Sequence, residues 1–360
     1  MPEGPPLRRP PTIALVVVAL VVLAVAAVVA IRLWPAPGGL ASALRFAPAG
    51  TERVSWTDWA AVRRELDADL GPDPRASQVE DFLDRAFEED LSPASALLSS
   101  APVLQTEFGF SPATVEWEMF AQGEAGAAVA LGLGDDLDAD ALADRLESLG
   151  YERPSSDVTS GGTWRGGVDL LPRIGPQLTP ELQHVAVLGN EDVLVTSDTV
   201  EGLENAVAVA SGDVEPLDEI EPVVERLGEP VAASVYTGSY ACTALAMSQA
   251  DTTAQAEGEA LVQRAGEVNP MTGFAVAREP GGTVRFAMSF ESEEQARVNA
   301  ESRAALASGP APGQGGEFTD RFTVESARAE GEVVVIDVRP VEGSYVLSDL
   351  GTGPVLFATC

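Results

Sequence analysis

The sequence predicts an α+β protein with an N-terminal transmembrane helix, a short helical neck and two similar α+β units built on mainly antiparallel sheets. An uninterrupted apolar run occupies residues 13–31, a helical period of apolar residues follows, and from Thr114 the period changes to two. The 360 residues suffice for two domains. The predicted divisions are a cytoplasmic stub (1–12), a transmembrane helix (13–34), a linker and helical neck (35–111), a first α+β unit (112–228) and a second α+β unit (229–360).

The apolar run predicts a membrane anchor. From Ile13 to Ile31 all 19 residues are Ala, Val, Leu or Ile, and at ~1.5 Å per residue this run approaches the thickness of the hydrocarbon core. Arg8 and Arg9 precede the run, which predicts a cytoplasmic N-terminus and an extracytoplasmic C-terminal region in a single-pass protein of the cell membrane. A cleaved signal peptide is the alternative, because Ala41-Ser42-Ala43 has the small-x-small form.

The first seventy residues resemble a known kind of protein. The arrangement RRPPTIALVVVALVVLAVAAVVA, a short Pro/Gly linker and VSWTDWAAVRREL (Val54 to Leu66) is similar to uncharacterised actinobacterial exported proteins with one membrane span. The same composition is also typical of salt-adapted archaeal proteins. The resemblance implies an exported, membrane-anchored protein, and it implies no chemistry.

The neck is expected to be mostly helical. Thr57 is placed to cap a helix in which Trp59, Val62 and Leu66 share one face. A second helix is predicted between Val79 and Leu91, where an apolar stripe alternates with acidic positions. We interpret this stripe as core; a docking face for a partner helix is the alternative.

In the first unit, alternation and glycine turns predict strands and helices in a set order. The expected elements are strands at 115–119 and 127–133, a helix at 142–149, a hairpin of 184–188 with 192–196, and joining helices at 200–210 and 222–227. In the second unit the same order of strand, turn, strand, helix, strand, turn, strand is expected. Its elements are strands at 274–278 and 283–290, a helix with a capping box at Ser292 and Gln295 that ends near 306, and strands at 322–328 and 332–338.

Charge and composition exclude several functions. The formal net charge is −34, and −36 falls on the part after the predicted anchor, so binding to nucleic-acid phosphates is disfavoured. All 22 basic residues are Arg. Without Lys, the chain has no Schiff-base amine, no Walker A lysine and no Ser-x-x-Lys pair.

An acidic run has the spacing of a calcium loop. The carboxylates of Asp136, Asp138, Asp140, Asp144 and Glu147 match ligand positions of an EF-hand. The position that needs Gly is Ala141, and the leucines nearby require a helix where the loop should run. We therefore interpret the run as a helix start and predict no metal ligand and no cofactor.

Two further sets of residues have catalytic chemistry in principle. Glu116 and Glu118 share a strand face at a spacing compatible with an inverting glycosidase, but a solvent-facing strand is the preferred interpretation. His184 lacks a Gly-x-Ser-x-Gly or zinc-spaced partner, so a partly buried, hydrogen-bonded structural role is expected. The glycine pairs at 161–162, 166–167 and 315–316 are interpreted as turns. No catalytic residue is predicted.

Cys242 and Cys360 are predicted to form a disulfide. Both follow the anchor, their number is even, and Cys360 is the last residue printed in the sequence. Two free thiols are the alternative. The bond would fasten an expected C-terminal strand, 355–358, to the segment around Tyr240.

These observations favour a membrane-anchored extracytoplasmic protein that binds a partner or ligand, or that serves as a structural module of the envelope. Its expected partners are the membrane, through residues 13–34, and an extracytoplasmic protein or small molecule, with no nucleic acid. The alternative is an anchored extracytoplasmic hydrolase whose active site combines distant Asp, Glu and Ser residues with His184. An enzyme is the less favoured of the two.

Overall fold

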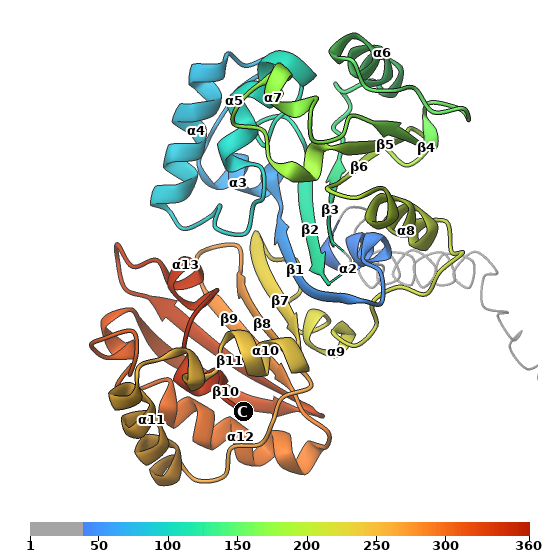
Figure 1. Cartoon of the computed structure of the whole chain (residues 1–360). Coiled ribbons are helices and arrows are strands. Elements are labelled where there is room, and N and C mark those ends of the chain that lie inside the picture. Colours follow the sequence, from blue (N-terminus) through green and yellow to red (C-terminus); the bar gives the residue numbers. More distant parts are fainter. Residues whose placement is uncertain (1–38, 125) are drawn as a thin grey trace, which may run out of the picture.

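The computed structural model describes residues 39–124 and 126–360, and one eleven-stranded sheet runs through them (Figure 1). The strands are β1 (Thr51–Thr57), β2 (Trp117–Gly123), β3 (Gly126–Gly132), β4 (Ser160–Arg165), β5 (His184–Leu188), β6 (Val193–Ser197), β7 (Ala232–Thr237), β8 (Gly273–Arg278), β9 (Val284–Ser289), β10 (Phe322–Glu330) and β11 (Val333–Pro340). Neighbouring strands are antiparallel throughout. The predicted α+β class with antiparallel pairing is therefore confirmed.

The two halves of the chain meet at the centre of this sheet. The strand order is β10-β11-β9-β8-β7-β1-β2-β3-β6-β5-β4. At the centre β1 pairs with β7, and Val54 lies opposite Val235 while Ser55 lies opposite Ser234. Figure 1 shows this junction as the blue strand β1 beside the yellow strand β7. The sheet is therefore continuous across both halves.

The order of strands outward from the centre is the same in both halves. It is β1-β2-β3-β6-β5 on one side and β7-β8-β9-β11-β10 on the other, with β4 added at the first edge. A long helix follows the third strand in each half, α6 (Ala139–Leu149) after β3 and α12 (Glu293–Leu306) after β9. Each half thus begins with a central strand that the sequence pattern did not predict.

The expected mostly helical neck also contains a strand that was not predicted, because Thr51–Thr57 form β1. This strand lies between β7 and β2, and five of its seven residues are buried. A strand covered on both faces lacks a solvent-facing row of side chains, so the alternation of a half-buried strand is weak. The next helix accordingly begins one residue later than expected, because Asp58 and not Thr57 caps it through the N–H of Ala61.

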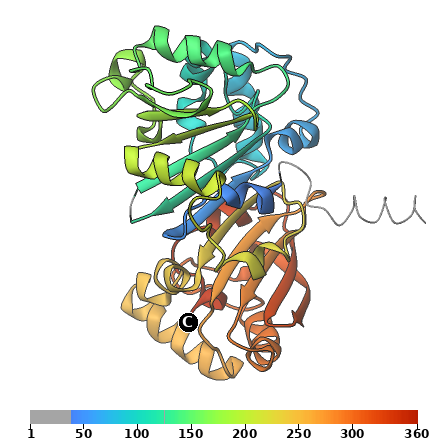
Figure 2. The same cartoon turned by 90° about the vertical axis from the view of Figure 1, so that its right-hand side faces the viewer.

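Helices cover both faces of the sheet and enclose three hydrophobic cores. The remaining helices are α2 (Leu40–Ala43), α3 (Trp59–Glu65), α4 (Ala76–Glu88), α5 (Ala101–Val103), α7 (Leu171–Ile174), α8 (Val200–Ala210), α9 (Glu221–Val224), α10 (Gly238–Ala244), α11 (Thr252–Ala265) and α13 (Val346–Leu350). Helices α3 to α6 cover one face of the first half, and α10 to α13 cover that face of the second half. The opposite face packs on α2, α8 and α9. Figure 2 shows these layers from the side.

The predicted stub and anchor, residues 1–12 and 13–34, lie outside the described residues. Within residues 39–124 and 126–360, none of the helices combines the length and the apolar character that crossing a bilayer requires. At the other end of the chain, the expected strand at 355–358 is wrong, because Leu356–Ala358 form a 3-10 turn. The N–H of Val355 bonds to the carbonyl of Leu245, and the carbonyl of Phe357 accepts from Arg303, so neither group joins a sheet.

Candidate functional site

A groove of about 1000 Å³ lies where β1 and β3 end and β2 begins. Helix α2 and the following residues form one wall, and the loop before β7 and the turn between β5 and β6 form the others. We call this hollow the α2 groove. Its lining residues are Gly39, Leu40, Ala41, Ser42, Ala43, Arg45, Phe46, Trp56, Asp58, Ala60, Arg64, Glu116, Trp117, Gly132, Leu133, Glu191, Asp192, Val193, Glu229 and Pro230.

Three aromatic rings form the floor of the α2 groove. Trp117 stacks on Trp56 with ring centroids 5.5 Å apart, and Phe46 lies 6.3 Å from Trp117. The indole N–H of Trp56 donates to the carbonyl of Pro230 at 3.0 Å, which fixes this ring against the loop before β7. The floor therefore joins α2, β1, β2 and the second half of the chain.

Gly132 makes room for the ring of Trp117. A Cβ atom at position 132 would lie 2.0 Å from the indole nitrogen, so only glycine permits this close approach. Trp117 is 9% exposed, and its indole N–H donates to no acceptor in the part of the chain that the structure describes. Trp117 thus presents a free hydrogen-bond donor at the floor.

Carboxylates dominate the rim of the α2 groove. Five acidic side chains line it and only two arginines do. Three of the acids are paired: Glu191 with Arg45 at 2.7 Å, Glu116 with Arg63 at 3.0 Å, and Asp58 with Arg64 at 3.9 Å. The other two, Asp192 and Glu229, have no ion pair with any described residue.

Asp58 has a perturbed environment within this rim. Burial raises its pKa above the ordinary value, and the negative charge of Glu229 raises it further. The N–H of Ala61 and the charges of Arg64 and Arg63 oppose this shift. Asp58 and Glu229 therefore carry like charges, and a bound cation would reduce the repulsion between them.

The expectation that Glu116 and Glu118 share a solvent-facing strand is wrong for Glu118. Its side chain is 1% exposed and accepts hydrogen bonds from Trp59, Ser95 and the backbone of Ala96. Burial raises the pKa of Glu118, and these hydrogen bonds oppose the rise. Because protein donors occupy its oxygens, Glu118 anchors a loop over the sheet and does not reach the α2 groove.

The acidic run at residues 136–147 starts a helix. Asp138 caps α6 through the N–H groups of Asp140 and Ala141, and α6 continues to Leu149. Gly150 then ends the helix with a φ of 98°. In the described ranges, no group of three or more His, Cys, Asp or Glu residues is arranged to hold a metal ion.

His184 begins β5, opposite Ser197 and Arg165 on the neighbouring strands. It is partly buried as expected, but its Nδ1 atom is buried without a hydrogen-bond partner among the described residues, so the expected hydrogen bond at this atom is absent. Burial and the charge of Arg165 lower the pKa of His184, and Asp198 opposes this. His184 does not line the α2 groove.

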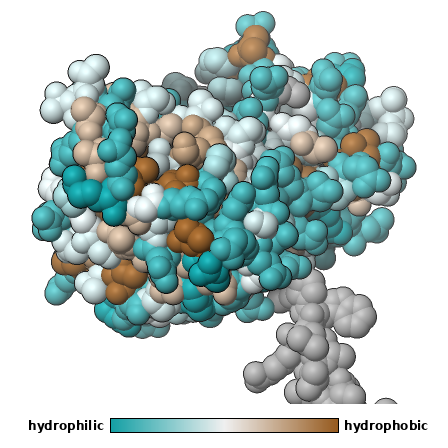
Figure 3. All heavy atoms as spheres, turned by 90° about the horizontal axis from the view of Figure 1, so that it is seen from below, coloured by the Kyte–Doolittle hydropathy of each residue, from teal (hydrophilic) through white to brown (hydrophobic). Residues whose placement is uncertain are grey.

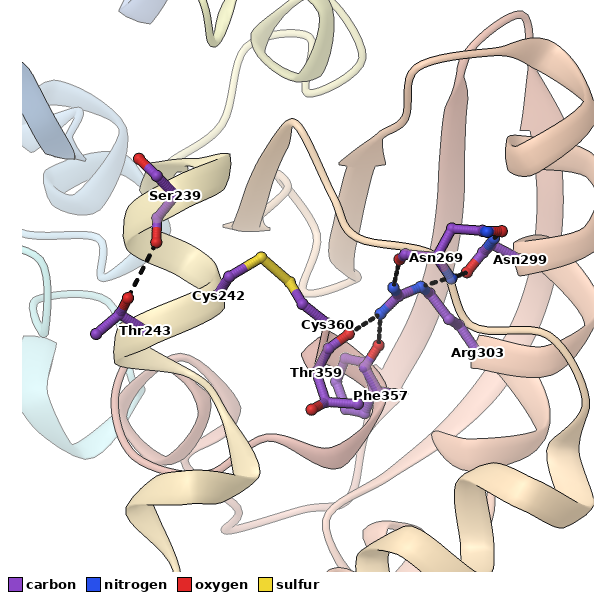
Figure 4. The surroundings of a disulfide bond; sticks show 9 residues. All are labelled: Ser239, Cys242, Thr243, Asn269, Asn299, Arg303, Phe357, Thr359 and Cys360. Carbon is purple, nitrogen blue, oxygen red and sulfur yellow. Dashed lines mark hydrogen bonds between the residues drawn. A yellow bond between two sulfur atoms is a disulfide. The ribbon is translucent and has the colours of Figure 1, made fainter.

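The predicted disulfide is confirmed. Cys242 in α10 and Cys360 are bonded, with Cα atoms 5.5 Å apart (Figure 4). Beside this bond, the buried guanidinium of Arg303 donates to the carbonyls of Phe357 and Thr359, to the carbonyl of Asn269 and to the side chain of Asn299. Figure 4 shows the guanidinium of Arg303 with two of these bonds running to Phe357 and Thr359 and the others to Asn269 and Asn299. We call residues 351–360 the C-terminal strap.

The exposed hydrophobic side chains of the described residues do not form a second candidate site. The large hydrophobic side chains that are exposed in the described residues are Phe87, Val168, Val214 and Val341. On the face drawn in Figure 3, hydrophobic side chains are scattered among hydrophilic ones. Isolated exposed side chains of this kind are normal for soluble surfaces.

Sequence reasoning missed the α2 groove because its residues come from separate segments. Trp117 is far in sequence from Phe46 and Trp56, and each of the three occupies a position that also suits a core residue. No local sequence signal marks these three aromatic residues, because the packing of α2, β1 and β2 brings their rings together.

Comparisons with known proteins identify no family. No family model matches the chain, and no curated protein matches it. Two solved structures are similar to it. "Structure of crystal form I of TP0453" has a TM-score of 0.41, 7% identity, and coverage of 86% of this chain and 96% of that one. "Structure of crystal form III of TP0453" has a TM-score of 0.43, 8% identity, and coverage of 85% and 96%. A likeness at this level establishes no shared function.

Proposed function

We propose that this protein is a membrane-anchored extracytoplasmic binding module that holds a partner in the α2 groove. The anchor would be residues 13–34, with the N-terminus in the cytoplasm and the rest of the chain outside. The apolar run and the preceding arginines support the anchor. The disulfide supports an oxidising compartment outside the cytoplasm.

The observation that carries the proposal is the α2 groove itself. It combines an aromatic floor with an indole donor and two carboxylates that have no partner among the described residues, in a hollow of about 1000 Å³. Ligand sites are typically concave, mostly apolar and fitted with a few polar groups. The groove meets this description.

A scaffold of two similar α+β units, divided near residue 229, is part of the same proposal. The recurring strand order on either side of the β1–β7 pair supports it. In this scaffold the α2 groove lies beside the junction, because Trp56 belongs to the first half and Pro230 to the second.

Binding is favoured over hydrolysis by the positions of the candidate catalytic groups. His184 lies outside the α2 groove, and the oxygens of Glu118 are occupied by protein donors. Glu116 does line the groove, where Arg63 pairs with it. A general acid and base pair needs two carboxyl groups that both reach one substrate, and this pair does not meet that need.

The anchoring can be tested with the full chain carrying a C-terminal epitope tag in bacterial cells. We expect proteinase K to remove the tag in intact spheroplasts, and we expect the protein to stay in the membrane fraction after an alkaline carbonate wash. A tag that is digested only after lysis, or a protein that the wash extracts, would contradict the proposed location.

Use of the groove can be tested by site-specific photo-crosslinking in the same cells. Benzoylphenylalanine at Ala60, which lines the α2 groove, should form a covalent adduct, while the same residue at Val168, an exposed position elsewhere, should not. Adding Trp117→Ala to the Ala60 variant should abolish the adduct, because this change removes the aromatic floor. Absence of an adduct at Ala60, or an adduct that survives Trp117→Ala, would contradict binding in the groove.

A further inference from the structure

We infer that the partner held in the α2 groove is a basic peptide segment, with Arg or Lys side chains at the carboxylate rim and a backbone carbonyl on the indole N–H of Trp117. This inference rests on the proposed function and specifies the chemistry of its ligand. Three independent features of the groove support it: the charge of the rim, the internal contact made by Arg45, and the unused donor of Trp117.

The charge of the rim selects a cation. The five lining carboxylates outnumber the two lining arginines, and Asp192 and Glu229 are without ion pairs in the described residues. Burial raises the pKa of Asp58 most, and the negative charge of Glu229 raises it further. A positive side chain between them would reduce this repulsion and gain two charge-assisted hydrogen bonds. An anionic ligand would meet repulsion at the same place.

Arg45 shows how the groove holds such a cation. Its guanidinium lies 4.7 Å from the centroid of the Phe46 ring and pairs with Glu191 at 2.7 Å. An aromatic face and a carboxylate therefore bind one guanidinium within the protein itself. The ring of Trp117 continues the same floor, and Asp192 follows Glu191 on the same rim.

The indole of Trp117 indicates that the ligand also supplies an acceptor. This side chain is 9% exposed, and its N–H donates to no described residue. Trp N–H groups usually find a hydrogen-bond acceptor, so a ligand carbonyl at this position would be favourable. A bare metal ion has no such acceptor. A peptide combines carbonyl acceptors, basic side chains and apolar atoms for the aromatic floor.

The inference can be tested with the full chain in a non-ionic detergent at 150 mM salt. The probe is the fluorescein-labelled peptide Gly-Leu-Arg-Gly-Arg-amide, and its matched control replaces both Arg residues by citrulline, which is neutral and nearly isosteric. Fluorescence anisotropy measures binding. We expect saturable binding of the Arg peptide and at least about tenfold weaker binding of the citrulline peptide, because about 1.4 kcal/mol corresponds to a factor of ten.

Paired variants distinguish binding in the α2 groove from a general attraction of the peptide to the acidic protein. Asp58→Asn with Glu229→Gln removes two rim charges, and Asn still serves as a helix cap at position 58. Glu257→Gln with Glu259→Gln removes two charges from exposed positions on α11. We expect about tenfold weaker binding for the rim pair and less than a twofold change for the α11 pair. Equal effects of the two pairs would overturn the inference, since binding would then reflect net charge alone.

Two further outcomes would also overturn it: no saturable binding of the Arg peptide, or equal affinities for the Arg and citrulline peptides. These results are distinguishable from failure of the proposed function. If Ala60 forms its adduct in cells while the Arg peptide does not bind, the groove is used by a ligand of another class. If Ala60 forms no adduct, the proposed function itself fails.

Discussion

Each half of the sheet buries a charged side chain that forms no ion pair with any described residue, Glu118 in the first half and Arg303 in the second. In the first half Glu118 is 1% exposed and accepts from an indole, a hydroxyl and a backbone N–H. In the second half Arg303 is 0% exposed, donates to three backbone carbonyls and one amide, and lies 5.3 Å from the ring centroid of Phe290. Burial lowers the pKa of Arg303 to about 9.

In both halves, neutral hydrogen-bonding groups surround the buried charged side chain. Each of these side chains also holds a peripheral segment against its half of the sheet. Glu118 holds residues 95–96 against β2, and Arg303 holds the C-terminal strap against α12. Only the second half adds a covalent fastening, between Cys242 and Cys360. We expect this difference between the halves to appear in the free energy of unfolding as well.

The largest expected effect comes from the covalent fastening. The bond closes a loop with a sequence separation of 118 residues, and the chain-entropy treatment assigns about 4–5 kcal/mol to a loop of this length. The variant Cys242→Ser with Cys360→Ser should lose about this much free energy of unfolding, measured in guanidinium chloride. Reductant should destabilise the wild type and leave the double variant unchanged. Equal stability of the two proteins without reductant would show that Arg303 alone suffices to hold the strap.

Arg303→Met should be the next most destabilising change, by about 3–4 kcal/mol, because it leaves the carbonyls of Asn269, Phe357 and Thr359 without their donor. The matched control is Arg297→Met on the same helix, where the side chain is 66% exposed and pairs with Glu294. The control should change the free energy of unfolding by less than about 1 kcal/mol. Comparable losses in the two variants would refute a special role for the buried guanidinium.

Glu279 extends the comparison to a half-buried carboxylate of the second half that lies close to charged groups. Burial raises its pKa to about 7, Arg285 opposes this and Asp337 adds to it. Because the pKa is raised in the folded protein, the proton stabilises the fold fully below about pH 4.5, and this stabilisation is lost as the pH rises through 7. Glu279→Gln should therefore gain up to about 3 kcal/mol relative to wild type between pH 5 and pH 8. Thermal unfolding at both pH values measures the gain, and a difference that does not change with pH would contradict it.

The smallest expected effect is that of Glu118→Gln, about 2 kcal/mol. The amide replaces one acceptor oxygen by a donor that faces the donors of Ser95, Trp59 or Ala96. Glu116→Gln is the matched control two residues earlier, with a side chain that is 47% exposed, and it should cost less than about 1 kcal/mol. Urea unfolding compares the two, and the comparison between the halves fails if Glu116→Gln costs as much as Glu118→Gln.

The sequence predicted the elements whose signals are local. The hairpin of β5 and β6 follows from two apolar runs around Gly189-Asn190-Glu191, and the start of α12 follows from Ser292, whose side chain accepts from the N–H of Gln295. The central strands β1 and β7 were missed because both are covered on two faces. Strand β4 was missed because its Gly161-Gly162 pair reads as a turn.

The candidate site was less predictable than the fold. The pairing of Cys242 with Cys360 followed from an even count of cysteines. In contrast, Glu118 was expected to face solvent but is buried. The two-residue repeat of a strand shows which face a side chain occupies and does not show what covers that face. Whether a loop covers that face depends on contacts between distant segments. The α2 groove has the same origin, since it forms where α2, β1, β2 and the loop before β7 meet.

By itself, the sequence determined the α+β class, the order of most elements, the acidity of the chain and its single disulfide, because these depend on local periodicity, composition and counting. Only the tertiary structure decided that the two halves share one sheet, that Glu118 and Arg303 are buried, and that three aromatic rings meet beneath a carboxylate rim. Burial and proximity depend on how the whole chain packs, because contacts between residues far apart in sequence determine them.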